Sequence, residues 1–132
     1  MITAAKWDAN VNFGPPLSIW ICVPELPPSL NEWSRKFWAE RHRMVQEMTN
    51  NLRLLALAKD IPKVEKAEVK LVYYFRDNRR RDPDNYIPKF LLDGLRKSGI
   101  IAEDNARVLR LPQPEFRIDR LQPRTEVWIM EW

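Results

Sequence analysis

The clearest strand signal in the chain is the stretch Lys66-Ala-Glu-Val-Lys-Leu-Val-Tyr-Tyr-Phe75. Apolar residues occupy every second position from Ala67 to Phe75, and charged residues alternate with them over the first half. Because successive side chains of a strand point to opposite faces of a sheet, this pattern predicts a strand with one buried face. Its β-branched and aromatic residues favour the same structure.

Similar patterns on either side of this stretch extend the sheet. Residues 17–23 alternate between apolar and other side chains and stop at Pro24, so they predict a second strand. Residues 106–111 and 125–132 predict further strands, with prolines between them. Residues 1–16 show no clear period and end in Gly14-Pro15-Pro16, so we expect them to form an N-terminal arm.

Two stretches with helical spacing lie between the strands. The first predicted helix starts at Ser29 or Asn31 as its N-cap and ends near Ala58. Apolar residues at steps of three and four give it one buried stripe: Trp33, Phe37, Met44, Val45, Met48, Leu52 and Leu55. The second is expected over 85–97, with Pro88 in its first turn and Ser98-Gly99 as its stop. Its buried side consists of Ile87, Leu91, Leu92 and Leu95.

The order of these elements is β-α-β-α-β-β. It predicts an α+β fold in which a single mixed β-sheet has two main helices packed on one face. A chain of 132 residues is the size of one domain, and no repeat or linker divides it. We therefore expect a single domain over 1–132, with 1–16 as its arm.

Composition excludes several classes of protein. No apolar run approaches the roughly 18–20 residues that cross a bilayer, and the first residues lack the apolar region of a signal peptide, so no membrane association is expected. Cys22 is the single cysteine, which favours a reducing, cytoplasmic location. With Cys22 as the single cysteine and His42 as the single histidine, the sequence argues against a Cys/His zinc site. Three glycines provide no phosphate-binding loop, so no nucleotide cofactor is expected.

Basic residues outnumber acidic residues by 22 to 18, and the excess lies in one part of the chain. Residues 76–124 contain 12 basic and 8 acidic residues, most of the basic ones arginine. Arginine donates two hydrogen bonds at once to a phosphate. A mixed-charge solvated surface would have a similar composition. The run Arg79-Arg80-Arg81 directly before Asp82 favours a polyanion site.

Asp82-Pro83-Asp84-Asn85 is the sharpest local motif. Pro83 biases Asp82 toward extended backbone, and residues two apart on an extended chain point to the same side. Two carboxylates placed in this way can share a cation. The same residues also suit a helix start, with Asp84 or Asn85 as the N-cap. Both interpretations remain open from the motif alone.

More acidic and basic residues follow within a short distance. Lys89 and Asp93 are four apart on one helical face, which is typical of a surface ion pair, although lysine lies toward the positive end of the helix dipole. Glu103-Asp104 falls in a polar turn before a strand. The strand end, helix and next strand can converge, so these acids become candidates for one site.

The motifs Arg81-Asp-Pro-Asp-Asn85, Lys89-Phe-Leu-Leu-Asp93-Gly-Leu95 and Gly99-Ile-Ile-Ala-Glu-Asp104 together resemble the RusA family of Holliday junction resolvases. The earlier segment Leu26-Pro-Pro-Ser-Leu-Asn31 is also similar to that family. The resemblance covers roughly residues 24–35 and 76–108. One departure is an extra residue between Asn85 and the lysine.

The resemblance implies a homodimeric, Mg²⁺-dependent endodeoxyribonuclease that cuts four-way DNA junctions by paired nicks, with Mn²⁺ as a substitute. The implied metal ligands are Asp82, Asp84 and Asp104, and the implied active-site lysine is Lys89, so these four form the catalytic set. On physical grounds the metal would activate a water, and Lys89 would stabilise charge on the phosphate or leaving group.

Other residues have supporting roles in this hypothesis. Asn85, Asp93 and Glu103 would support the site from around it, and flanking phosphates would be held by Arg76, Arg79, Arg80 and Arg81. His42 belongs with a basic helix face. Among the tryptophans, Trp20, Trp33, Trp38 and Trp128 are candidates for a dimer interface or for packing at the crossover, but we expect most of them in the core.

Two alternatives remain. One is a non-catalytic DNA-binding module that selects branched DNA by its structure, with the acids serving as caps and ion pairs. The other is a metal-dependent phosphohydrolase for small substrates. The absence of a glycine-rich phosphate cradle and the wide spread of arginines argue against the second.

Overall fold

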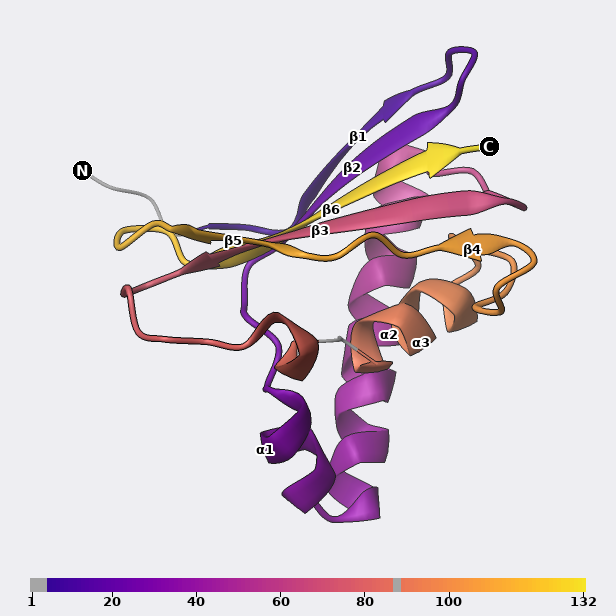
Figure 1. Cartoon of the computed structure of the whole chain (residues 1–132). Coiled ribbons are helices and arrows are strands. Elements are labelled where there is room, and N and C mark those ends of the chain that lie inside the picture. Colours follow the sequence, from indigo (N-terminus) through magenta and orange to yellow (C-terminus); the bar gives the residue numbers. More distant parts are fainter. Residues whose placement is uncertain (1–4, 87–88) are drawn as a thin grey trace.

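A computed structural model describes residues 5–86 and 89–132 of the chain (Figure 1). Its strands are β1 (Asp8–Asn12), β2 (Ser18–Val23), β3 (Ala67–Phe75), β4 (Leu109–Arg110), β5 (Glu115–Ile118) and β6 (Arg124–Glu131). Its helices are α1 (Leu30–Arg35), α2 (Trp38–Lys59), the short 3₁₀ helix η1 (Pro83–Asn85) and α3 (Lys89–Lys97).

The strands form one mixed sheet with the order β1-β2-β6-β3-β4, and β5 pairs with β3 as well. The last strand, β6, lies between β2 and β3 and is antiparallel to both, whereas β4 and β5 run parallel to β3. The helices lie on one side of this sheet (Figure 1). The predicted α+β fold with a single mixed sheet is therefore confirmed.

The expected N-terminal arm is wrong over part of its length, because residues 8–12 form β1 and pair with β2. The segment is only five residues long, so its alternation rests on Ala9 and Val11 alone and is much weaker than that of the longer strands. Residues 1–4 of the expected arm lie outside the described residues. The strand expected over 106–111 is reduced to the two residues of β4, and β5 was not expected at all.

The first predicted helix is in fact two. Ser29 is the N-cap of α1, in a capping box with Glu32. Lys36 and Phe37 are extended, with ψ of 144° and 149°, and α2 begins at Trp38. Neither glycine nor proline lies at the break, so local sequence gives no signal for it. The break places Phe37 in solvent rather than on the predicted buried stripe.

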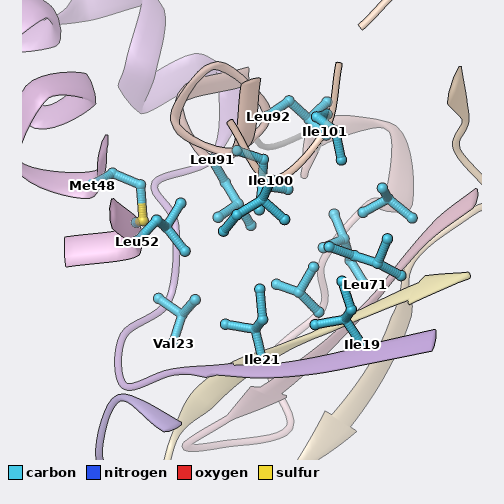
Figure 2. Close-up of a cluster of buried hydrophobic side chains, with 14 of the residues drawn as sticks. Ile19, Ile21, Val23, Met48, Leu52, Leu71, Leu91, Leu92, Ile100 and Ile101 are labelled. Atoms are coloured by element: carbon cyan, nitrogen blue, oxygen red, sulfur yellow. The ribbon is translucent and has the colours of Figure 1, made fainter. Parts of the chain in front are cut away.

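The core lies between the sheet and the two longer helices (Figure 2). Figure 2 shows side chains of β2, α2, α3 and residues 100–101 meeting there: Ile19, Ile21, Val23, Met48, Leu52, Leu91, Leu92, Ile100 and Ile101. Gly94 permits close packing of α3 on α2, because a Cβ there would lie 2.8 Å from Cγ of Met48. Cys22 is buried in β2, and burial raises the pKa of its thiol.

The second predicted helix is confirmed from Lys89 onward, with Leu91, Leu92 and Leu95 buried as expected. Gly99 follows it with a positive φ of 85°, in agreement with the predicted stop. Residues 83–85 form η1 instead of the first turn. The expected positions of Ile87 and Pro88 lie outside the described residues.

The tryptophans contradict the expectation of a mostly buried set. Trp20 and Trp33 are partly buried, whereas Trp38 is 76% exposed and Trp128 is 48% exposed. Trp38 begins α2 just beyond the break, so its side chain falls outside the helix packing. Across the part of the chain that the structure describes, none of the helices combines the length and apolar character of a membrane-spanning segment.

Candidate active site

The turn that follows β3 is braced by Arg81. Its guanidinium donates to Oδ1 of Asp77 at 2.7 Å and to the carbonyl oxygens of Asp77 and Arg79, and it lies 3.9 Å over the ring of Phe75. The hydrogen bond from Arg81 to the Asp77 carboxylate, with a second from the backbone N–H of Arg79, holds the pKa of Asp77 below its usual 3.8. Arg81 therefore shapes the turn from which the acidic motif emerges.

Three other arginines of this segment point into solvent. The side chain of Arg80 is 93% exposed and its Nε lies 3.9 Å from Oδ1 of Asp82. Arg79 is also exposed and pairs with Asp77 at 3.4 Å, and Arg76 is exposed at the end of β3. Such cations keep most of their capacity to bind an anion, because an exposed ion pair is weak.

The Asp-Pro-Asp-Asn motif forms η1 with its carboxylates outside the helix hydrogen bonding. Asp82 occupies the N-cap position with the extended backbone that Pro83 predicts, φ −91° and ψ 127°, but its side chain makes no capping hydrogen bond. Within the described residues the Asp84 side chain has no hydrogen bond or ion pair, and it is exposed. The helix-start interpretation therefore leaves the Asp82 and Asp84 side chains unexplained.

Asn85 joins two segments that are far apart in the chain. Its Oδ1 accepts a hydrogen bond of 3.2 Å from the backbone N–H of Asn31 at the start of α1. Nearby, the ring of Trp33 stacks on Phe90 of α3 with 5.4 Å between centroids. The starts of α1 and α3 and the whole of η1 are thus held together, as Figure 1 also shows.

Arg96 brings Asp93 and Asp104 together. Its Nη2 lies 3.9 Å from Oδ1 of Asp93, and its Nε lies 4.0 Å from Oδ2 of Asp104. Of the two alternatives for Asp93, the ion pair with Lys89 is absent among the described residues, and Asp93 pairs with the arginine three residues later. Lys89 is exposed at the first residue of α3 and has no ion pair among the described residues.

The described residues do not bring the three predicted metal ligands into one cluster. Carboxylate oxygens are the donors that Mg²⁺ prefers, so the donor chemistry fits the ion. However, no three His, Cys, Asp or Glu side chains of residues 5–86 and 89–132 lie close enough to hold one metal ion. Asp104 lies instead beside Arg96, near the end of α3.

Sequence reasoning missed three contributors to this region: Arg96, Asn31 as a partner of Asn85, and the ring contact of Trp33. Arg96 is three residues after Asp93 on the same helix, and this spacing is a signal that could have identified it. The other two contacts join segments more than fifty residues apart and have no local signal. Glu103 is exposed and makes no hydrogen bond or ion pair within the described chain.

The comparisons with known proteins leave the family open. No protein-family model matches the chain, and no curated protein matches it.

Proposed function

We propose that this chain is a Mg²⁺-dependent endonuclease that cuts branched DNA, as the resemblance to the RusA family implies. The observation that carries the proposal is the exposed pair Asp82 and Asp84, for which the described residues offer no hydrogen-bonding role. Two like charges on one short turn cost free energy, and a cation would relieve that repulsion. The surrounding arginines supply the positive charge that a phosphate backbone requires.

Each part of the site has a distinct task in this proposal. Asp82 and Asp84 would hold the cation, and Asp104 would have to leave its weak, exposed pair with Arg96 and move toward them to join the site. When bound, Mg²⁺ supplies a Lewis acid for the scissile phosphate and a water of lowered pKa. Lys89 stabilises charge that develops on the phosphate, and Asn85 holds η1 against α1.

Phosphate binding is assigned to Arg76, Arg79 and Arg80, which are exposed. Arg81 is only 16% exposed and already donates three hydrogen bonds, so its task is to position the turn. We also propose that the protein acts as a homodimer, because a four-way junction has near two-fold symmetry and paired nicks need two sites.

The test is cleavage of a labelled synthetic four-way junction and of its matched linear duplex, each with Mg²⁺ or with EDTA. We expect paired nicks in the junction with Mg²⁺ only. Asp82→Asn should abolish cleavage while it retains or tightens junction binding, since repulsion of phosphate is relieved. Asp60→Asn, the same chemical change at the exposed end of α2, is the matched control and should cut normally.

Three outcomes would contradict the proposal. Mg²⁺-dependent nicking that persists in Asp82→Asn would remove the catalytic assignment. Junction binding without nicking under any divalent cation would indicate a non-catalytic module. Hydrolysis of a simple phosphodiester as rapid as that of junction DNA would indicate a small-substrate phosphohydrolase.

A further inference from the structure

The corner between α1 and α2 carries two strongly exposed aromatic side chains. Phe37 is 83% exposed and Trp38 is 76% exposed, more than any other large hydrophobic residue that the structure describes. The corner lies at the end of the molecule farthest from the sheet (Figure 1). Among the described residues neither ring contacts another ring or a cation, and large apolar side chains exposed together are typical of interaction sites.

Positive charge surrounds these rings. Residues 35–43 contain four cations and one acid. Lys36 pairs with Glu40 at 3.3 Å, and Arg43 pairs with Glu47 at 3.6 Å in an exposed pair. Arg35 and Arg41 make no ion pair with any residue in the described ranges. An apolar protein partner would have to desolvate these charges, whereas a polyanion would be attracted by them.

A polar groove of about 400 Å³ lies along α2 and begins at His42, one helical turn after Trp38. It is lined by His42, Gln46, Asn50 and Arg53 on α2 and by Lys97 at the end of α3. Arg53 donates a hydrogen bond to the carbonyl oxygen of Lys97 at 3.1 Å, which holds the two helices at this point. Cations and amide side chains of this kind contact the sugar-phosphate backbone without reading its sequence.

The corner is also close to the candidate active site. Asn31, which contacts Asn85, is near the start of α1, and Arg35 is its last residue. The six residues of α1 rise about 9 Å, which is close to three base steps of DNA at about 3.4 Å each. A strand that enters the active site at η1 therefore reaches the aromatic corner within a few nucleotides.

We propose that this corner is a second DNA-binding surface, on which Phe37 and Trp38 stack against unpaired bases at the branch point. Arg35, Arg41 and the groove beside His42 hold the adjoining phosphates. The inference rests on the proposed function only for the identity of the ligand as DNA. Aromatic stacking is tolerant of sequence because every base has a flat face, so the surface would select unpaired structure rather than a base order.

The test measures DNA binding in EDTA, so that no cleavage occurs. The probes are a four-way junction with 2-aminopurine at the crossover, a single strand with the same base, and a fully paired duplex. Binding of the wild type should quench the 2-aminopurine, because stacking on a ring changes its environment. The variant Phe37→Leu/Trp38→Leu keeps apolar side chains but loses both aromatic faces. It should lose the quenching and bind the junction and the single strand about tenfold or more weakly, with duplex binding unchanged.

The matched control is Leu54→Ala/Leu57→Ala, which changes two exposed apolar residues of the same helix, 65% and 74% exposed. It should behave as the wild type. Full quenching and full affinity in the leucine variant would overturn the inference. A change in sedimentation coefficient without a change in DNA binding would also overturn it, because the corner would then join two copies. Failure of the wild type to bind any of the three DNAs would refute the proposed function as well.

Discussion

Two arginines of this chain each lie between two carboxylates, but they are bound very differently. Arg124, at the start of β6, donates to Asp119 at 2.8 Å and to Glu126 at 2.9 Å, and its guanidinium lies 3.8 Å over the ring of Tyr74. Its side chain is 17% exposed, and the Trp20 indole donates to the same Glu126. All three charged groups have short hydrogen bonds, so this group belongs to the framework of the sheet.

Arg96 lies between Asp93 and Asp104 at 3.9 and 4.0 Å, beyond hydrogen-bond distance. Its side chain is 36% exposed, and its buried Nε has no hydrogen-bond partner in the described part of the chain. The comparison shows that proximity of opposite charges does not define a role. The charges around Arg124 are all joined by hydrogen bonds. Arg96 and its two neighbouring acids are not, so they can still bind another group.

The largest expected effect is the loss of stability when Arg124 is replaced. Arg124→Ala removes the partner of Asp119 and of the buried Glu126, so the free energy of unfolding should fall by about 2–4 kcal/mol. Urea denaturation followed by circular dichroism measures it. Arg117→Ala, which breaks the exposed pair with Glu115, is the control and should cost much less. Equal losses in the two variants would contradict the framework role.

Asp104→Asn tests the role of the carboxylate that lies beside Arg96. If Asp104 serves the proposed metal site, single-turnover cleavage of a junction should slow by about 100-fold, a size typical for loss of an electrostatic contact in a transition state. The free energy of unfolding should stay within about 0.5 kcal/mol of the wild type, because its pair with Arg96 is long and exposed. A destabilised variant with normal cleavage would reverse the assignment.

A smaller effect, on the Mg²⁺ requirement for cleavage, is expected when Arg96 is replaced. Arg96→Gln releases Asp104 from its cation, so we expect the Mg²⁺ concentration for half-maximal cleavage to fall a few-fold. A titration of cleavage rate against Mg²⁺ measures this shift. A higher requirement for Mg²⁺ would show instead that Arg96 holds Asp104 in its working position.

The smallest effect concerns pH. Hydrogen bonds from the backbone N–H of Gln122, then from Arg124 and the N–H of Leu121, hold the pKa of Asp119 below its usual 3.8. A carboxylate with a depressed folded-state pKa contributes stability above its unfolded pKa and loses it as the pH falls through the folded pKa. The Tm of the wild type should therefore drop below about pH 4, and the drop should be smaller in Asp119→Asn. Parallel curves for the two proteins would contradict this origin of the acid sensitivity.

The long strands were predictable because each has one buried face. In β2 and β3 the apolar residues alternate because every second side chain is buried, and β6 is rich in apolar residues. The structure confirms all three predicted strands. β1 and β5 were missed because they are short: each alternates, but with only two apolar residues, Ala9 and Val11 in β1 and Phe116 and Ile118 in β5. The break at Lys36 and Phe37 depends on how α1 packs against α3 through Trp33 and Phe90, which local sequence does not contain.

The candidate site divides in the same way. The extended backbone at Asp82 follows from the proline after it, and the structure agrees. The sequence left the role of Asp93 open between an ion pair and support of the site. The structure pairs it with Arg96, because i,i+3 and i,i+4 neighbours on a helix are equally near and only the surroundings select one. The position of Asp104 depends on a turn after α3 that brings it to Arg96, and residue spacing alone could not show that.

The buried thiol of Cys22 has a practical consequence for spectroscopy. Because it is the single cysteine, is 5% exposed and has a raised pKa, it reacts slowly with maleimides and methanethiosulfonates. A cysteine introduced at an exposed position such as Asn78 can therefore carry a spin label without removal of the native residue. Dipolar coupling between labels would then report directly whether two copies associate, and at what separation, with and without a junction.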